Sequence, residues 1–264
     1  MRATFWLLDA PDSLDVQSRR EPDGTGLGAY DRRGGALVHH SPLPAYEDQE
    51  FAREARHLHS TTFIAHVRYA SGSPVALENT HPFEQHGRLF AHNGVFRGLD
   101  ELEAELGPQR ALVRGATDSE RLFALVTREI ERADGDVEQG LVTATNWVAE
   151  HLPVYALNLV LTTADRVWAL RYPETHELYV LDGASGTRFG SRLLRIHMHD
   201  PVRAVVVASE PLDDNPGWRL LAPGELINVA PDLTVRSRVA LPGAPAHQLT
   251  HHDLHPDEAA SQAA

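Results

Sequence analysis

The order of the helix and strand patterns constrains the fold of this chain more than any other feature of its sequence. A well-marked helix is predicted to begin at Thr117, and a second is predicted over residues 137–151. After these two helices come strand patterns over residues 156–162, 167–172, 177–181 and 204–208. Because helices cluster here and do not alternate strictly with strands, the order favours an α+β fold over a doubly wound parallel sheet.

Local signals support these elements. Thr117 and Glu120 have the spacing of a capping box, and an apolar face follows at Leu122, Phe123, Val126 and Ile130. Ala164-Asp165 has the composition of a hairpin turn between two strands. The other predicted elements are partial helical spacing over residues 3–20, an amphipathic helix over 47–58, strands over 62–69 and 88–92, and a weaker strand over 226–229.

Length and composition are those of a globular protein with one large domain or two small ones, since 42% of the 264 residues are hydrophobic. We assign residues 1–243 to a single domain. Residues 244–264 have no periodicity and are predicted to form a disordered tail. The tail contains the run His251-His252-Asp253-Leu254-His255, but flexible terminal histidines are more often inert than metal-binding, so we assign no metal to it.

Charge and cysteine content exclude several functions. The formal net charge of −13 argues against a nucleic acid or an anionic membrane surface as partner. No run of about 18 apolar residues could span a bilayer, and Asp9 interrupts the apolar stretch that a signal peptide would need. We therefore predict a cytoplasmic protein. The absence of cysteine excludes disulfides, thiolate metal sites and a cysteine nucleophile within this sequence.

Five short segments combine a polar residue at a strand end or helix start with a nearby small or turn-forming residue. They are residues 22–26, 65–71, 78–83, 90–94 and 115–120. Such positions bring functional groups to one rim of a sheet, where a backbone can approach a ligand closely. The sequence therefore predicts that these segments meet at one site.

Each polar residue in these segments has a structural and a functional interpretation. Arg68 could form a structural salt bridge, or its guanidinium could bind a ligand carboxylate in bidentate fashion. Asn93-Gly94 could be a hairpin turn, or an Asn amide and a glycine N–H could form an oxyanion hole. Asp118 could support a helix N-terminus or bind an ammonium group. His81, before a proline, could be a buried, hydrogen-bonded histidine or part of a binding pocket.

Taken together, the segments resemble the class II glutamine amidotransferases, in the branch of small stand-alone bacterial proteins. The resemblance runs from about residue 4 to about residue 229. It is most specific in the runs His66-Val67-Arg68, Asn79-Thr80-His81-Pro82, His92-Asn93-Gly94 and Thr117-Asp118-Ser119-Glu120. The resemblance implies a four-layer αββα sandwich of the N-terminal-nucleophile hydrolase type, and hydrolysis of glutamine to glutamate and ammonia through a γ-glutamyl thioester.

The resemblance also implies roles for individual residues. Arg68 would hold the α-carboxylate of glutamine, and Asp118 would take its α-ammonium group. Asn93 and Gly94 would form the oxyanion hole. His81 would shape the glutamine pocket, and Tyr69 and Ser71 would line it beside the arginine. No cofactor is implied. Glutamine or a γ-glutamyl amide is the expected substrate, and any ammonia acceptor would be made by a separate synthase.

The family nucleophile, a cysteine at the mature N-terminus with its own α-amine as base, has no counterpart here. Arg2 follows Met1, and the chain starts at the helix that the family's first strand precedes. We therefore expect a missing leading strand, from a start site assigned too late, and no glutaminase activity of the chain as printed. A reading frame extending upstream of Met1 with a Met-Cys-Arg-like segment would test this expectation.

Two other hypotheses stay open at this point. The chain could be a non-catalytic binding protein that retains the pocket for glutamine or a γ-glutamyl compound. It could also be a metal hydrolase that uses His66, His81 and His92, although no carboxylate stands at ligand spacing to them.

Overall fold

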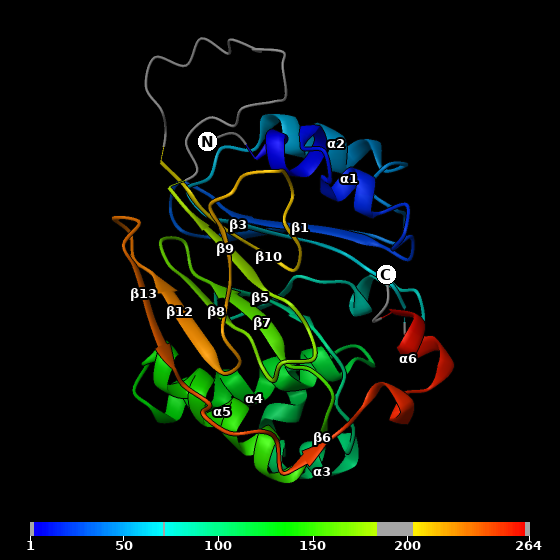
Figure 1. Ribbon diagram of the computed structural model, residues 1–264, viewed down its shortest axis with the longest axis vertical. Coiled ribbons are helices and arrows are strands. Elements are labelled where there is room, and N and C mark those ends of the chain that lie inside the picture. Colours follow the sequence, from blue (N-terminus) through cyan, green and yellow to red (C-terminus); the bar gives the residue numbers. More distant parts are fainter. Residues whose placement is uncertain (1–2, 71, 184–202, 262–264) are drawn as a thin grey trace.

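The structure is a computed structural model that describes residues 3–70, 72–183 and 203–261. Its elements form four layers, helix on sheet on sheet on helix, as Figure 1 shows along its vertical axis. This is the four-layer α+β sandwich that the sequence analysis predicts, and its three larger sheets are antiparallel. The expected hairpin at Ala164-Asp165 is confirmed, because it joins two antiparallel strands.

One outer layer consists of three helices: α3 (Leu99–Leu106), α4 (Asp118–Arg132) and α5 (Val137–His151). The bounds of α5 are those that the sequence predicts. Short 3₁₀ segments lie at Leu77–Asn79, Gly107–Leu112 and His251–Asp253. The side chains Leu122, Phe123 and Val126 of α4 are fully buried against the adjacent sheet, in the largest hydrophobic cluster. This layer therefore forms the main core.

A six-stranded antiparallel sheet covers these helices, in the order β13-β12-β8-β7-β5-β4. Its strands are β4 (Phe83–Gln85), β5 (Arg88–Asn93), β7 (Asn158–Thr162), β8 (Val167–Leu170), β12 (Glu225–Val229) and β13 (Val235–Val239). The other face of this sheet packs on two smaller sheets, through a cluster that includes Ile64, Leu89 and Ala91 and another that includes Ala169 and Val180.

The two smaller sheets share the next layer. One has the order β2-β1-β3, with β1 (Thr25–Tyr30), β2 (Ala36–Ser41) and β3 (Phe63–Val67). The other has the order β10-β9-β11, with β9 (Tyr179–Asp182), β10 (Val205–Ala208) and β11 (Trp218–Leu220). All pairs within both sheets are antiparallel.

The second outer layer contains the π-helical turn η1 (Phe5–Asp9), α1 (Leu14–Gln17) and α2 (Gln49–His57). It covers both small sheets. Leu7 packs in a cluster with Leu27 and Val67 of the first sheet, whereas Trp6 packs with Leu181 of the second. The turn η1 therefore bridges the two small sheets from above.

The stretch that composition predicts to be disordered contains three described elements. The strand β14 (His247–Gln248) pairs in parallel with β6 (Pro153–Val154), and a 3₁₀ turn and α6 (Pro256–Ser261) follow it. The division of the chain at residue 243 stays a prediction.

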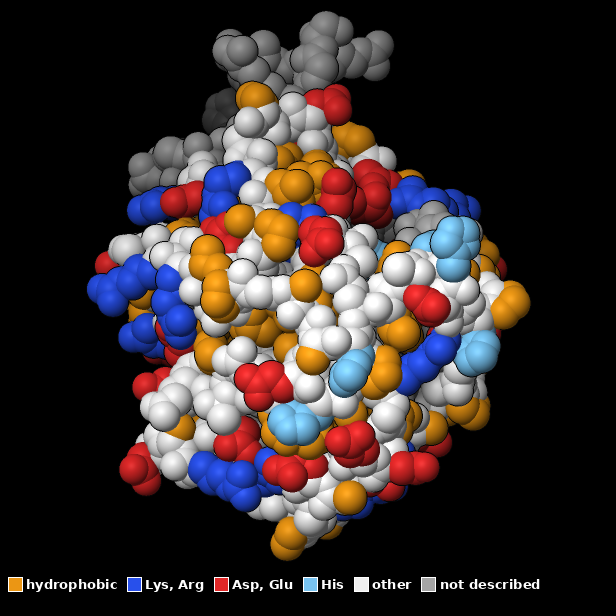
Figure 2. Space-filling model, turned by 60° about the horizontal axis from the view of Figure 1, so that its bottom comes forward, with side chains coloured by type: hydrophobic (Ala, Val, Ile, Leu, Met, Phe, Trp, Pro, Cys, Tyr) orange, Lys and Arg blue, Asp and Glu red, His pale blue; other side chains and the backbone are white. Residues whose placement is uncertain are grey.

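In the part of the chain that is described, none of the helices is both long and apolar enough to cross a membrane. On the face shown in Figure 2, acidic and basic side chains are interspersed among hydrophobic and uncharged ones.

Candidate functional site

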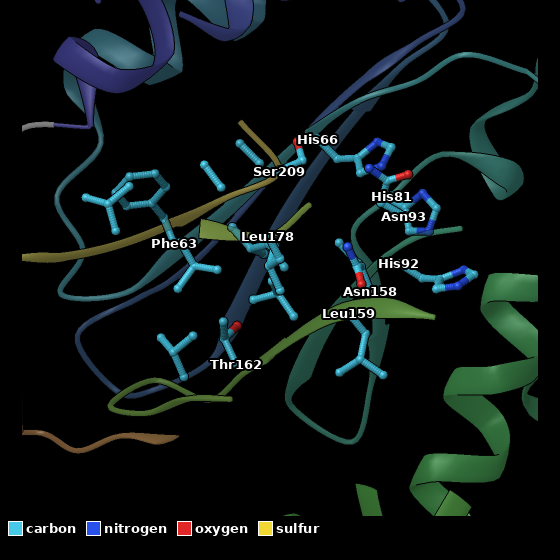
Figure 3. A pocket seen from close by; sticks show the side chains of 18 of the residues that line it. Phe63, His66, His81, His92, Asn93, Asn158, Leu159, Thr162, Leu178 and Ser209 are labelled. Atoms are coloured by element: carbon cyan, nitrogen blue, oxygen red, sulfur yellow. The ribbon is translucent and has the colours of Figure 1, made fainter. Parts of the chain in front are cut away.

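A cavity of about 910 Å³ lies between the two sheet layers, and the residues predicted from the sequence line it. They are Arg68, Tyr69, His81, Asn93, Gly94 and Asp118. Ser71, the remaining predicted residue, lies outside the described residues. Figure 3 shows that His66, His81, His92 and Asn93 lie at one side of this cavity and that Phe63 lies at the opposite side. We call the side that carries the histidines and Asn93 the polar end of the cavity.

Arg68 follows β3 directly and is buried, with 4% of its surface exposed. Its Nη2 donates to the Ser73 hydroxyl at 2.8 Å and to the Pro74 carbonyl at 3.2 Å, but its buried Nη1 has no hydrogen-bond partner. Burial lowers the pKa of the guanidinium, and the charge of Asp23 opposes this shift. Arg68 forms none of the ion pairs found among the described residues, so the salt-bridge interpretation has no support there. One face of a buried cation is left for a ligand anion.

Asn79 connects two loops. One loop contains Pro74, which accepts a hydrogen bond from Arg68, and the other contains Ala116 and leads to Asp118. Its Nδ2 donates to the Pro74 carbonyl at 3.0 Å, and its Oδ1 accepts from the Ala116 N–H at 2.7 Å. A Cβ at Gly115 would collide with Oδ1 of Asn79, so this close approach requires glycine. Asn79 is therefore a positioning residue. Asn79 belongs to one of the motifs found in the sequence, but the sequence alone did not predict that it positions the two loops.

Asn93 ends β5, and its side chain lies at the surface of the cavity. The interpretation of Asn93-Gly94 as a hairpin turn is wrong, because β5 pairs with β4 and β7 and the chain after Gly94 runs to a bridge between Phe96 and Val154. A Cβ at residue 94 would collide with the Ala156 carbonyl oxygen. Glycine thus lets the backbone pass close to Ala156 at the point where an amide side chain faces the cavity.

Asp118 is the first residue of α4, where it supports the helix N-terminus, and it also lines the cavity; its binding of an ammonium group stays a prediction. Its Oδ1 accepts from the Ser119 N–H at 2.7 Å, and its Oδ2 from the Phe96 N–H at 3.4 Å. The expected capping box is only half formed. Thr117 accepts from the Glu120 N–H, but the Glu120 carboxylate accepts from Gly115 rather than from Thr117.

Three histidines surround the polar end of the cavity. The rings of His66 and His81 have centroids 4.3 Å apart, and His92 bonds Ser119 through Nδ1 at 2.9 Å. His81 is 6% exposed, and neither of its ring nitrogens has a partner, so it is buried but not hydrogen-bonded as the structural interpretation required. Burial lowers the pKa of all three, that of His66 to about 4, which leaves them neutral at pH 7.

These histidines do not form a metal site. Among the described residues, the groups close enough to share an ion are His39, Glu50 and Glu54, which lie elsewhere. His39 already bonds Asp48, and Glu50 pairs with Arg53. The metal-hydrolase hypothesis has no structural support from the three histidines of the cavity.

Two cavity residues were missed in the sequence. Asn158 begins β7 opposite Asn93; its Nδ2 donates to the Glu177 carbonyl and its Oδ1 accepts from the Tyr172 N–H, both at 2.9 Å. A polar residue at the start of an apolar strand was the available signal. Glu21 also lines the cavity, and burial together with the charge of Glu210 raises its pKa to about 7.

The arrangement suits an amino-acid-like ligand. The unpartnered Nη1 of Arg68 offers a site for a carboxylate, Asp118 offers negative charge, and the Asn93 amide lines the same cavity. The neutral histidines add hydrogen-bonding groups without charge.

A family model described as glutamine amidotransferases class-II matches residues 14–237. A γ-glutamyl-hercynylcysteine sulfoxide hydrolase of Mycobacterium tuberculosis is 31% identical over 235 residues, covering 84% of this chain and 85% of the relative. The Mycolicibacterium smegmatis protein of the same name is 29% identical over 84% of this chain and 88% of its own length. The solved structure of a glutamine aminotransferase class-II domain protein from Silicibacter pomeroyi superposes with a TM-score of 0.59 at 23% identity, over 83% of this chain and 92% of that one.

Proposed function

Because the chain belongs to the class II glutamine amidotransferases, we propose that its cavity binds glutamine or a γ-glutamyl amide for hydrolysis of the side-chain amide bond. The observation that carries this proposal is the unpartnered Nη1 of the buried Arg68, in the same cavity as Asp118 and Asn93. A buried cationic nitrogen without a partner is costly, and a ligand carboxylate would remove that cost.

Each residue has one task in this proposal. Arg68 binds the α-carboxylate, and Asp118 binds the α-ammonium group, so the two ends of the amino-acid portion are fixed. Asn93 and the Gly94 N–H donate to the γ-carbonyl oxygen as it becomes an oxyanion. His81 and Tyr69 shape the pocket around the side chain. The names of the two mycobacterial relatives support a γ-glutamyl amide as one of the two substrate classes.

The chemical step needs a thiol. A thiolate attacks the γ-carbonyl carbon, the carbon–nitrogen bond breaks, and ammonia or an amine leaves after taking a proton; water then hydrolyses the thioester to glutamate. The sequence contains no cysteine, so this group must come from outside it. We propose that the chain as printed binds the substrate and does not turn it over. Use of the ammonia by a synthase would require a separate protein.

The second candidate is a non-catalytic binding protein, favoured by the absence of cysteine from the sequence. It makes the same prediction for binding and differs only once a thiol is supplied at the site. Restored ammonia release would exclude it.

Calorimetric titration with glutamine and with a γ-glutamyl amide tests the binding proposal. We expect saturable binding that Arg68→Ala weakens at least tenfold, because a charge-assisted bond to the carboxylate is lost. Arg88→Ala is a matched control: Arg88 is also partly buried with unpartnered nitrogens, but it does not line the cavity. Failure to bind either compound, or equal weakening by both substitutions, would refute the proposal.

A further inference from the structure

The last described segment of the chain, residues 244–261, lies across loops that carry residues of the candidate site. Figure 1 shows this segment running from β13 past β6 to α6 at the side of the sandwich. We call it the strap. Its composition predicts a disordered tail, but it makes hydrogen bonds, an ion pair and apolar contacts with the rest of the chain. The strap is therefore part of the folded structure.

Backbone hydrogen bonds anchor the first half of the strap. The Leu249 N–H donates to the Val154 carbonyl, and the Ala246 N–H donates to the Ala149 carbonyl, both at 2.8 Å. Gln248 also pairs in parallel with Val154 through β14 and β6. These bonds satisfy backbone groups inside the protein, so this half is fixed to α5 and β6.

Apolar packing extends this anchor toward Gly94. The strap's Leu249 and Leu254 pack against a small buried cluster. The cluster contains Val95, which directly follows Gly94, and Ala156, whose carbonyl a Cβ at residue 94 would strike. The strap therefore supports the two stretches of chain that fix the backbone at Gly94.

An arginine just beyond these residues holds the second half of the strap. Nη2 of Arg97 donates to the Asp253 carbonyl and to the Glu258 carboxylate, both at 2.7 Å. Glu258 also accepts from the His255 N–H at 2.8 Å. Because the Glu258 side chain is only 15% exposed, this ion pair is less screened by water than one at the surface. It fixes α6 beside Arg97.

One carboxylate of α6 reaches the loop that holds Arg68. The Gly72 N–H donates to Oδ2 of Asp257 at 3.1 Å. The next residue, Ser73, accepts a hydrogen bond from Nη2 of Arg68, as does the Pro74 carbonyl. Asp257 therefore fixes the backbone immediately before the two groups that orient the guanidinium.

Packing does not hold the loop at this point. Gly72 is exposed, and a Cβ placed on it would meet no atom within 4 Å. An exposed glycine has many accessible backbone conformations, so its order depends on hydrogen bonds. Loss of the bond to Asp257 would free the backbone next to Ser73.

We propose that the strap is a positioning element of the substrate site. Through Asp257 it fixes the loop that orients Arg68, and through its leucines it supports the chain at Gly94. None of the described residues of the strap lines the cavity, so Asp257 acts through Gly72 and touches no substrate. The effect on substrate binding rests on the proposed function, whereas the effect on the loop does not.

Backbone dynamics without ligand test the contact with the loop. Nitrogen-15 relaxation should give Gly72 an order parameter near the rigid value of about 0.85, and one below about 0.6 in Asp257→Ala. Asp257→Asn keeps an oxygen that can accept from the Gly72 N–H and should retain the order. His252→Ala is the matched control, because His252 is also exposed on the strap and its side chain forms no hydrogen bond with the described residues.

Calorimetric titration with glutamine measures the consequence for the site. Asp257→Ala should weaken binding at least threefold, because a freer loop orients the Arg68 guanidinium less well. Asp257→Asn and His252→Ala should bind within about twofold of the unsubstituted chain. All three variants should have the same urea midpoint, since a single bond between exposed groups contributes little to global stability. A change in affinity without a change in stability is what positioning predicts.

The coupling must also run from the substrate to the strap, because binding and order are linked in both directions. The Ala259 N–H, which bonds His255 in α6, should exchange with solvent at least twofold more slowly when glutamine is saturating. In Asp257→Ala this protection by glutamine should be lost.

Unchanged order of Gly72 in Asp257→Ala would overturn the inference whether or not glutamine binds. A freer loop with unchanged affinity, or equal weakening in His252→Ala, would overturn it as well. If the unsubstituted chain binds no glutamine, the proposed function is refuted instead, and the order parameters of Gly72 alone decide whether the strap holds the loop.

Discussion

At the scale of single residues, the cavity is built from polar groups that are buried before any ligand is present. Arg68 and His81 together have three buried nitrogens without partners, whereas His92, Asn79 and Asn158 are held by hydrogen bonds. Unsatisfied groups of this kind are rare in folded proteins. The bonded residues position the unsatisfied ones, so the two kinds of residue should respond differently to substitution.

Asn93→Ala tests the oxyanion hole. With a thiol supplied at the site, we expect turnover to fall by about 10²–10³-fold, because one donor to the developing negative charge is removed. Substrate affinity should change little, since the ground-state carbonyl carries less charge. Steady-state kinetics would separate kcat from KM, and unchanged turnover would remove Asn93 from the mechanism.

Asn79→Ala tests the positioning role. It removes the hydrogen bonds to the Pro74 carbonyl, which keeps its bond from Arg68, and from the Ala116 N–H, and each lost bond costs about 0.5–1.5 kcal/mol of unfolding free energy. Substrate binding should weaken as well, although the hydrogen bonds of Asn79 go to the backbone of the two loops and not to Arg68 or Asp118 themselves. Urea denaturation and calorimetry measure the two effects. Asn228→Ala, which removes one long bond to Glu138, is the control and should have a smaller effect; equal effects would argue against the role.

The sequence predicted most of the residues at the polar end because they lie at strand ends and helix starts. Arg68, Asn93 and Asp118 could be found in this way, and the structure brings them to one cavity. The alternatives for Arg68 and Asn93 could not be decided from the sequence, because a salt bridge and a hairpin depend on partners that are distant along the chain. Asn158 was missed for the same reason, since its position opposite Asn93 depends on strand pairing.

At the scale of elements, the predictions followed the hydrophobic pattern and failed where the pattern is weak. The helix at Val137–His151 and the later strands were predicted well because their apolar residues recur regularly. Strand β1 was missed because its sequence Thr25–Tyr30 contains two glycines, which are depleted in strands. Those glycines face Pro82 and His81, where a Cβ would collide, so packing overrides strand propensity.

Helix α4 depends on its N-cap, which also orients Asp118. Thr117→Ala removes the bond from the Glu120 N–H and should lower the unfolding free energy by about 1 kcal/mol. Thr117→Ser, which keeps the hydroxyl, should retain most of the stability. Thermal unfolding of the two variants checks this. Loss of stability in both alike would show that the methyl group, rather than the cap, matters.

At the scale of the whole molecule, the layer order could be predicted, but the division of one layer into two small sheets could not. The succession of helix and strand patterns favours an α+β fold, and the resemblance to a family implies four layers. The separation of the two small sheets depends on the absence of pairing between β3 and β10. The sequences of these two strands are of the same kind as those of strands that are paired on both sides, so this absence could not be predicted from them. The two small sheets are joined in the structure by side chains of η1, such as Trp6 and Leu7, rather than by backbone pairing.

The buried histidines make the stability of the molecule depend on pH. His81 has a pKa well below its usual value because of burial, followed by the charges of neighbouring groups, and that of His66 is lowered to about 4. The unfolded chain takes up protons at these sites below about pH 6.5, and the folded chain does not. Their contribution to stability is therefore present above pH 6.5 and is lost as the pH falls toward 4. Glu21 has the opposite effect on stability. Its pKa is raised to about 7, so its contribution to the free energy of unfolding falls as the pH rises from about 4.5 to 7.

His81→Gln isolates the histidine effect, because glutamine is neutral in both states. A histidine that stays neutral when folded costs about 1.4 kcal/mol at about pH 5.5 relative to neutral pH, from an unfolded pKa of about 6.5. The loss of unfolding free energy between about pH 7.5 and pH 5.5 should therefore be smaller in the variant by about this amount. Other groups, including the paired carboxylates, contribute equally to both proteins and cancel in the difference. Urea denaturation at the two pH values measures it, and identical losses in the two proteins would show that His81 takes up a proton without unfolding.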